Sequence, residues 1–265
     1  MKVYSFPLSD YSELASRLAK SASEHLGDLL VSCYLLGSCA RGEERPGVSD
    51  VDVLLVTQGK EFVPTWERLP SKYSFVGAFS KEAERLAKEG AAPRSPLRNK
   101  VLILTVIGRK ALKHETNGML YFDLKEAKML AGEDVRGDLR RPSWSALDEN
   151  LFGKVSRWRE RMLTNLLTLD VGKEPHRLAS YAVMYSLPTA AAYITLGKRK
   201  MVMSKKDIPD AFAREFPRFK SSSVLYDVLD EYLNWKSRDD DFGRLASLWV
   251  RSLKFLLEIQ QNIDS

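Results

Sequence analysis

The stretch LLVSCYLLGSCARGEERPGVSDVDVLLV, residues 29–56, decides the fold of this 265-residue chain. Residues 29–37 form a short apolar run that ends at Gly37, which predicts a strand buried on both faces. A turn-rich segment follows, and residues 49–56 predict a second strand. We therefore expect the segment between the two strands to lie at one end of a sheet.

The flanking sequence predicts helices and a third strand around this pair. Apolar residues at helical spacing over residues 9–26, behind Ser9 and Asp10, predict an amphipathic helix with a capping interaction from Glu13. Helical periodicity returns over residues 71–90, and residues 99–107 predict the third strand.

Only helical patterns remain from residue 145 onward, after the polar stretch 136–144. We therefore predict two domains of ordinary size. Residues 1–140 should form an α+β domain, a mixed sheet with flanking helices, and residues 141–265 an all-α helical bundle.

Composition excludes several classes of protein. Apolar residues make up 44% of the chain and charged residues 29%, which excludes a disordered chain. No run of 18 uncharged apolar residues or signal sequence is present, so we expect a soluble, cytoplasmic protein with no membrane contact. Two cysteines, Cys33 and Cys39, are too few for a disulfide framework and have the wrong spacing for zinc.

The net charge of +6 favours anionic partners such as nucleotides, phosphates or nucleic acids. Basic residues cluster in two segments, residues 93–113 and residues 198–206. Each cluster is equally compatible with a solvated basic face.

The loop between the first two strands combines a phosphate-binding turn with a pair of acids. Gly37 lets the backbone approach a phosphate, and the Ser38 hydroxyl is placed to donate to it. Asp50 and Asp52 are two residues apart on a strand, so their carboxylates project from the same face. Two carboxylates suit Mg²⁺, which completes its octahedron with phosphate oxygens and water. Together these features predict a site for a nucleoside triphosphate.

The run Gly37-Ser38, Ala40-Arg41-Gly42, then Ser49-Asp50 and Asp52, resembles the signature of the DNA polymerase beta-like nucleotidyltransferase superfamily. The resemblance implies that Gly37 and Ser38 contact the triphosphate, and that Asp50 and Asp52 are catalytic ligands of two Mg²⁺ ions. It further implies that Arg41 shapes the nucleotide loop and that Ser49 steadies the strand carrying the acids.

A second, less specific resemblance covers residues 190–217 and 227–235, which are similar to the helical domain of streptomycin-type aminoglycoside adenylyltransferases. It implies that Lys206 and Tyr232 reach the nucleotide. A surface lysine and a core tyrosine are the competing interpretations.

The chain departs from the superfamily pattern at one position. Active members carry a third carboxylate on an adjacent strand, whereas residues 100–107 contain no acid. Asp123, in an apolar setting, is the substitute we predict for metal binding or for taking the proton of the acceptor hydroxyl.

Three functions follow from these observations. The first is transfer of a nucleoside monophosphate to a hydroxyl of a small molecule or macromolecule, with release of pyrophosphate. The transfer that we favour is of AMP from Mg·ATP. The second is a non-catalytic or weakly active regulatory protein that binds Mg·NTP, because the third strand has no acid. The third is nucleic-acid binding, which ranks last because the chain has no RNA-recognition motif.

Overall fold

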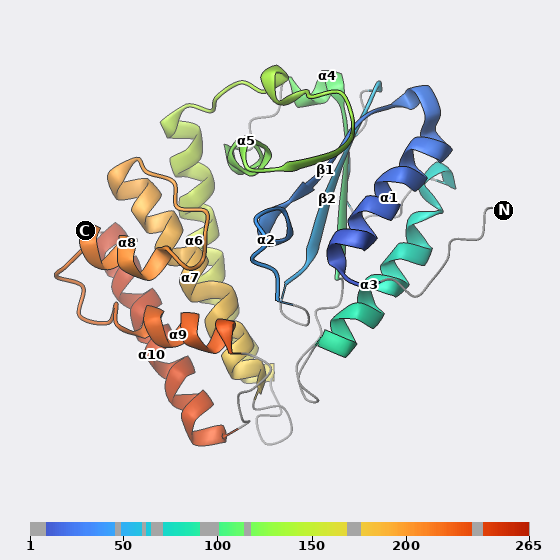
Figure 1. The fold of residues 1–265 in the computed structure, drawn as a ribbon. Helices are drawn as coiled ribbons and strands as arrows, with labels where there is room; N and C mark the ends of the chain where they lie inside the picture. The colour runs from blue at the N-terminus through green and yellow to red at the C-terminus, as the bar shows by residue number, and fades with distance from the viewer. Residues whose placement is uncertain are drawn as a thin grey trace. The chain divides into compact units, whose positions relative to one another are not determined.

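The computed structural model describes residues 9–45, 49–59, 62–64, 71–90, 101–113, 118–168, 176–234 and 241–264. The chain divides after Ser143 into two compact units. Figure 1 shows an α+β unit drawn from blue to green and a helical unit drawn from yellow-green to red. The mixed sheet with flanking helices and the all-α second part agree with the predicted fold class.

A five-stranded mixed sheet with strand order β3-β4-β2-β1-β5 is the framework of the first unit. The strands are β1 (Leu30–Leu36), β2 (Val51–Thr57), β3 (Phe62–Pro64), β4 (Leu102–Gly108) and β5 (Lys128–Gly132). The central strand β2 runs antiparallel to β1 and parallel to β4. The end of β1 therefore lies beside the beginning of β2, and the loop between them is held at that end of the sheet.

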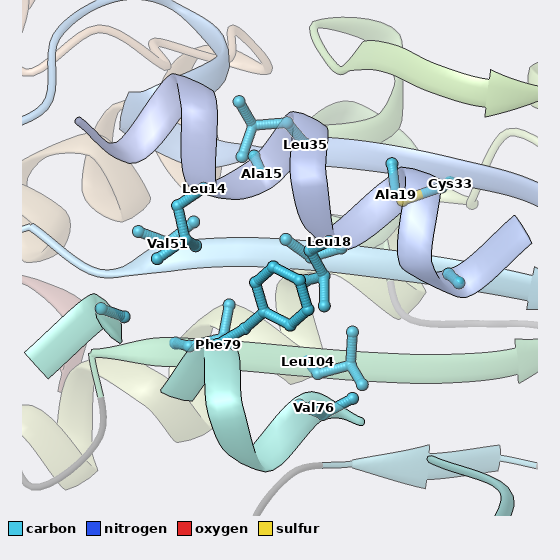
Figure 2. Close-up of a cluster of buried hydrophobic side chains, with 14 of the residues drawn as sticks. Leu14, Ala15, Leu18, Ala19, Cys33, Leu35, Val51, Val76, Phe79 and Leu104 are labelled. Atoms are coloured by element: carbon cyan, nitrogen blue, oxygen red, sulfur yellow. The ribbon is translucent and has the colours of Figure 1, made fainter. Parts of the chain in front are cut away.

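Two long helices, α1 (Tyr11–Leu26) and α3 (Val76–Gly90), cover one face of the sheet. Figure 2 shows Leu14 and Leu18 of α1 and Phe79 of α3 against Val51 and Leu104 of the strands. These side chains are almost completely buried. Each large apolar side chain buried in this way contributes about 1.5–3 kcal/mol relative to an exposed one, so this layer fixes the register of β1 and β2.

The opposite face of the sheet carries a smaller apolar layer from α4 (Arg109–Leu112) and α5 (Gly118–Lys125). Leu112 of α4 and Leu124 of α5 pack there against Tyr34 and Leu54. Because side chains alternate along a strand, this is also the face toward which Asp52 is directed.

The start of α1 has the predicted cap. Asp10 is the N-cap residue, and its carboxylate accepts a hydrogen bond from the Glu13 backbone N–H at 2.8 Å. The Glu13 carboxylate in turn accepts a bond from the Ser9 backbone N–H at 2.8 Å, and this reciprocal arrangement satisfies backbone donors at the start of the helix.

The second unit is built around one long, largely apolar helix, α7 (His176–Lys198). It packs against α6 (Trp144–Thr168), α8 (Ile208–Glu215), α9 (Val224–Leu233) and α10 (Phe242–Asp264). An aromatic cluster of Tyr193, Phe212, Phe219 and Phe255 joins α7, α8 and α10. A helix that is apolar on most of its surface requires such neighbours on all sides.

Two edge strands, β3 and β5, were not predicted from the sequence. β5 has mostly exposed or half-buried residues and gives no apolar run, whereas the predicted strands at residues 29–37, 49–56 and 99–107 correspond to β1, β2 and β4. Within the ranges that the structure describes, no helix is long and apolar enough to cross a bilayer.

Candidate functional site

The candidate site lies where β1 ends and β2 begins. Leu36, the last residue of β1, pairs with Asp52, the second residue of β2. Gly37 and Ser38 follow Leu36 directly and start the four-residue helix α2 (Gly37–Ala40). The pairing of β1 with β2 therefore brings the glycine-serine bend and Asp52 to one end of the sheet.

Gly37 approaches Asp52 so closely that another residue would not fit without a shift. Its φ of +65° lies in the left-handed region, and a Cβ at this position would be 2.9 Å from Asp52 Oδ2. Glycine avoids both the backbone strain and the contact. The carboxylate of Asp52 consequently lies directly beside the backbone of the bend.

Ser38 is 7% exposed and follows this glycine on the first turn of α2. Backbone N–H groups in the first turn of a helix have no partner within the helix. The loop after α2 folds back, because the Glu43 N–H donates to the Ser38 carbonyl at 2.9 Å. This hydrogen bond holds the loop against the first turn of α2.

Ser49 steadies the beginning of the acidic strand. Its hydroxyl accepts a hydrogen bond from the Arg45 N–H at 2.9 Å, and its own N–H donates to the Arg45 carbonyl at 2.7 Å. These two bonds join the segments on either side of residues 46–48, which lie outside the described ranges.

Arg41 is held by two carboxylates. Its Nε donates to Glu43 Oε2 at 3.1 Å, and its Nη1 lies 3.6 Å from Glu126 Oε2. Glu126 follows α5, the helix that carries Asp123. Arg41 therefore ties the loop to the layer that covers the Asp52 face of the sheet.

Asp50 lies immediately before β2, one residue outside the strand. Its backbone carbonyl accepts a hydrogen bond from the Cys39 thiol at 3.3 Å. The pKa of that thiol is raised, first by burial and then by the negative charges of Glu44, Asp52 and Asp50, while a hydrogen bond with Ser38 acts in the opposite direction.

The position beside Asp52 on the next strand is apolar. Asp52 is in register with Ile103 of β4, and neighbouring residues in register share one face of a sheet. This is where an acid on the adjacent strand would lie. Asp123 lies half-buried on α5, the helix that covers the same face of the sheet. The Asp123 side chain already interacts with another group of the chain.

Among the described residues, no three His, Cys, Asp or Glu side chains are grouped so as to hold a metal ion by themselves. Mg²⁺ needs only one or two protein carboxylates when phosphate oxygens and water complete its shell. Asp52 beside the backbone of Gly37 meets that requirement, and the buried Oε2 of Glu44 has no hydrogen-bond partner. The residues present thus fit a magnesium-bound nucleotide.

Glu44 is the residue at this end of the sheet that sequence reasoning missed. It follows Glu43 in the loop, and nothing in the pattern distinguishes the two glutamates. The structure separates them, because Glu43 pairs with Arg41 whereas Glu44 Oε2 is buried without a partner.

Lys206 and Tyr232 both belong to the second unit. Lys206 is exposed just before α8, whereas Tyr232 on α9 is 1% exposed. The cation over the Tyr232 ring is Lys205, whose Nζ lies 4.5 Å from the ring centroid. Their predicted contacts with a nucleotide stay predictions.

Ion pairs partly neutralise both basic clusters. Arg109 pairs with Glu133 and with Asp138, the latter at 2.6 Å. In the second cluster Arg199 pairs with Asp148 and also lies over the Trp144 ring. Arg94, Arg98 and Lys100 lie outside the described ranges. These pairs reduce the positive field that nucleic-acid binding would need.

Comparisons with known proteins identify a related domain in the first unit and a related fold. Residues 15–96 match the family model of the nucleotidyltransferase domain, which includes the glycine-serine bend and both aspartates. The fold resembles spectinomycin adenyltransferase AAD(9) from Enterococcus faecialis, crystallised with ATP and spectinomycin. The TM-score is 0.55 at 13% identity, over 95% of this chain and 100% of that one.

A nucleotidyltransferase-like protein from Exiguobacterium sibiricum 255-15 aligns with a TM-score of only 0.31 and 10% identity, over 93% of this chain and 74% of that one. No curated protein sequence matches the chain significantly. The family model confirms the resemblance to nucleotidyltransferases for residues 15–96, and the structural match confirms the fold.

Proposed function

We propose that this chain transfers a nucleoside monophosphate from a magnesium-bound triphosphate to a hydroxyl group of an acceptor. Its residues 15–96 match a nucleotidyltransferase domain. The donor that we favour is ATP, which would transfer AMP. The observation that carries the proposal is the approach of Gly37 to Asp52. It unites a backbone open to phosphate with a carboxylate that suits a divalent cation.

Each residue at this end of the sheet has a separate task in the proposal. Asp50 and Asp52 would hold Mg²⁺, which supplies charge neutralisation on the phosphates and orients them for in-line attack. The backbone of Gly37 and the Ser38 hydroxyl bind phosphate oxygens. Arg41 and Ser49 keep the loop in place through the hydrogen bonds described above.

The transfer replaces one phosphorus–oxygen bond by another. The acceptor oxygen forms a bond to the α-phosphorus, and the bond from that phosphorus to the bridging oxygen breaks, with its electron pair leaving on pyrophosphate. The acceptor hydroxyl must also lose a proton. Asp123 is our proposed proton acceptor, because α5 covers the face toward which Asp52 is directed.

The first acceptors to test are spectinomycin, which is bound in the structurally similar enzyme, and streptomycin, the substrate of the enzymes that the second half of the sequence resembles. Each compound is incubated with the protein, Mg²⁺ and α-labelled ATP, while pyrophosphate and labelled product are measured. Transfer predicts pyrophosphate release that requires an acceptor and is lost in Asp52→Asn. Release that is equal in Asp52→Asn and wild type would contradict the proposal.

A regulatory nucleotide-binding protein is the second candidate function. Ile103 favours it, because this apolar residue occupies the in-register position beside Asp52 where an acid would otherwise lie. Loss of general-base help typically costs two to four powers of ten in rate, while nucleotide binding persists. Magnesium-dependent ATP binding without transfer to any acceptor would select this alternative.

A further inference from the structure

Glu44 presents a buried acceptor that the protein leaves unused. Its Oε2 is shielded from solvent and has no hydrogen-bond partner. Leaving a buried polar group unsatisfied costs about 1–3 kcal/mol, and more for a charged group. Such an atom in a folded protein calls for a partner that is present only in another state.

The surroundings of Glu44 indicate the charge of that partner. Glu44 stands in the loop between Glu43, whose N–H donates to the Ser38 carbonyl at 2.9 Å, and Arg45, whose N–H donates to the Ser49 hydroxyl at 2.9 Å. The loop therefore holds Glu44 between the glycine-serine bend and the residue before Asp50. The Nε of its neighbour Arg45 is also buried without a hydrogen-bond partner. An unsatisfied carboxylate oxygen in the loop that leads to two further acids favours a cation.

We propose that Glu44 is an outer carboxylate of the magnesium–nucleotide site, whose Oε2 accepts a hydrogen bond from the water shell of the cation held by Asp50 and Asp52. This inference rests on the proposed function and adds a residue to its site.

An outer position agrees with the rest of the geometry. Among the described residues, Glu44 and the two aspartates do not form a three-ligand metal group, so direct coordination by all three is not what the structure shows. Mg²⁺ dehydrates reluctantly and keeps several waters. Carboxylates that accept hydrogen bonds from such a shell orient it and add negative charge.

The test measures metal binding and needs no turnover. Free Mn²⁺, used as a probe for the divalent site, is followed by electron paramagnetic resonance in the presence of α,β-methylene ATP. We compare wild type with Glu44→Gln, Glu44→Asp, Asp52→Asn and the control Glu84→Gln. Glu84 lies on α3, which packs on the other face of the sheet, and undergoes the same change of charge.

We expect Glu44→Gln to weaken Mn²⁺ binding about 10-fold to 100-fold, the usual loss for an outer partner of a metal ligand. Glu44→Asp, which keeps the charge, should recover part of the affinity, and Glu84→Gln should bind as wild type. Near-ultraviolet circular dichroism without metal checks that each variant is folded.

Two results separate the inference from the function beneath it. If Asp52→Asn loses Mn²⁺ and Glu44→Gln binds it as tightly as wild type, the role of Glu44 is wrong and the nucleotide site stands. If Asp52→Asn also binds Mn²⁺ as wild type does, the proposed function itself fails. Equal losses in Glu44→Asp and Glu44→Gln would also overturn the inference, because the carboxylate charge would then be irrelevant.

Discussion

Gly37 follows the end of β1, Asp52 lies near the start of the antiparallel strand β2, and a Cβ at position 37 would lie 2.9 Å from Oδ2 of Asp52. The absence of a side chain at one residue thus determines where the carboxylate of the other can lie. This contact joins the phosphate-binding bend to the acid that is proposed to hold the cation.

Replacing Gly37 by alanine tests this relationship. We expect Gly37→Ala to lose about 1–2 kcal/mol of stability from its left-handed backbone, and to weaken magnesium-dependent binding of an ATP analogue because Asp52 is displaced. Gly42→Ala is the matched control. Its φ of +67° imposes a similar strain, but nothing lies within 4 Å of its Cβ. Urea unfolding should show similar losses of stability in the two variants. Calorimetry should show weaker binding of the nucleotide analogue in Gly37→Ala only. Equal nucleotide affinities of the two variants would refute the argument.

Arg41 provides a second test, since it ties the loop to Glu43 and Glu126. We expect Arg41→Ala to cost about 1 kcal/mol of stability, the value of partly exposed ion pairs, and to weaken nucleotide binding by loosening the bend. Arg85→Ala also removes two ion pairs, with Glu82 and Glu89, but on α3. Fluorescence titration with a labelled ATP analogue should distinguish the two variants. Equal affinities of the two variants for the ATP analogue would show that Arg41 forms surface ion pairs without contributing to nucleotide binding.

Gly132 tests the edge strand that the sequence did not reveal. Its φ is +87°, and a Cβ there would lie 2.0 Å from the Val31 carbonyl oxygen of β1. Because backbone must move to admit a methyl group, Gly132→Ala should cost at least about 2 kcal/mol. Gly137→Ala, with nothing within 4 Å of its Cβ, should change stability by no more than about 0.5 kcal/mol. Similar urea midpoints for the two variants would mean that β5 is not paired as described.

The hydrogen bonds of Glu258 should make the stability of the helical unit depend on pH. Burial tends to raise the pKa of its carboxyl, but hydrogen bonds from the Ser221 hydroxyl and from the backbone N–H groups of Ser221 and Lys220 outweigh this and lower the pKa. A carboxyl whose pKa is lower in the folded state stabilises it above the unfolded pKa, about 4.3 for glutamate, and loses that contribution as the pH falls.

Glu258→Gln should therefore lower the unfolding temperature at pH 7, by an amount corresponding to about 1 kcal/mol for this partly exposed group. The difference between variant and wild type should shrink steadily below about pH 4. Thermal unfolding followed by circular dichroism across this range is the measurement. A difference that stays constant from pH 7 to pH 3 would show that ionisation of Glu258 contributes nothing.

The sequence predicts the centre of the first unit because its signals are local. The buried runs of β1, β2 and β4 and the cap formed by Asp10 and Glu13 are fixed by neighbouring residues, and the structure confirms them. β5 has no such signal, since it depends on pairing with the distant strand β1 and on Gly132 fitting against Val31.

The candidate site divides in the same way. Spacing alone singled out Gly37, Ser38, Asp50 and Asp52, because a glycine marks the bend and two acids stand two residues apart at the start of an apolar run. The structure begins β2 at Val51, so only Asp52 of the two acids lies on the strand. Spacing could not separate Glu44 from Glu43, since their difference arises from which one Arg41 engages. Nor could it show that Ile103 is in register with Asp52, which depends on the pairing of β2 with β4.

Calorimetric titration of α,β-methylene ATP into wild type and Asp52→Asn, each with Mg²⁺ and with excess chelator, tests the central claim most directly. We predict that wild type binds the analogue with Mg²⁺ and loses at least tenfold in affinity, about 1.4 kcal/mol, both when the cation is removed and when Asp52 is replaced. Binding of equal strength in all four titrations would contradict the claim that the glycine-serine bend and this aspartate hold a magnesium-loaded nucleotide.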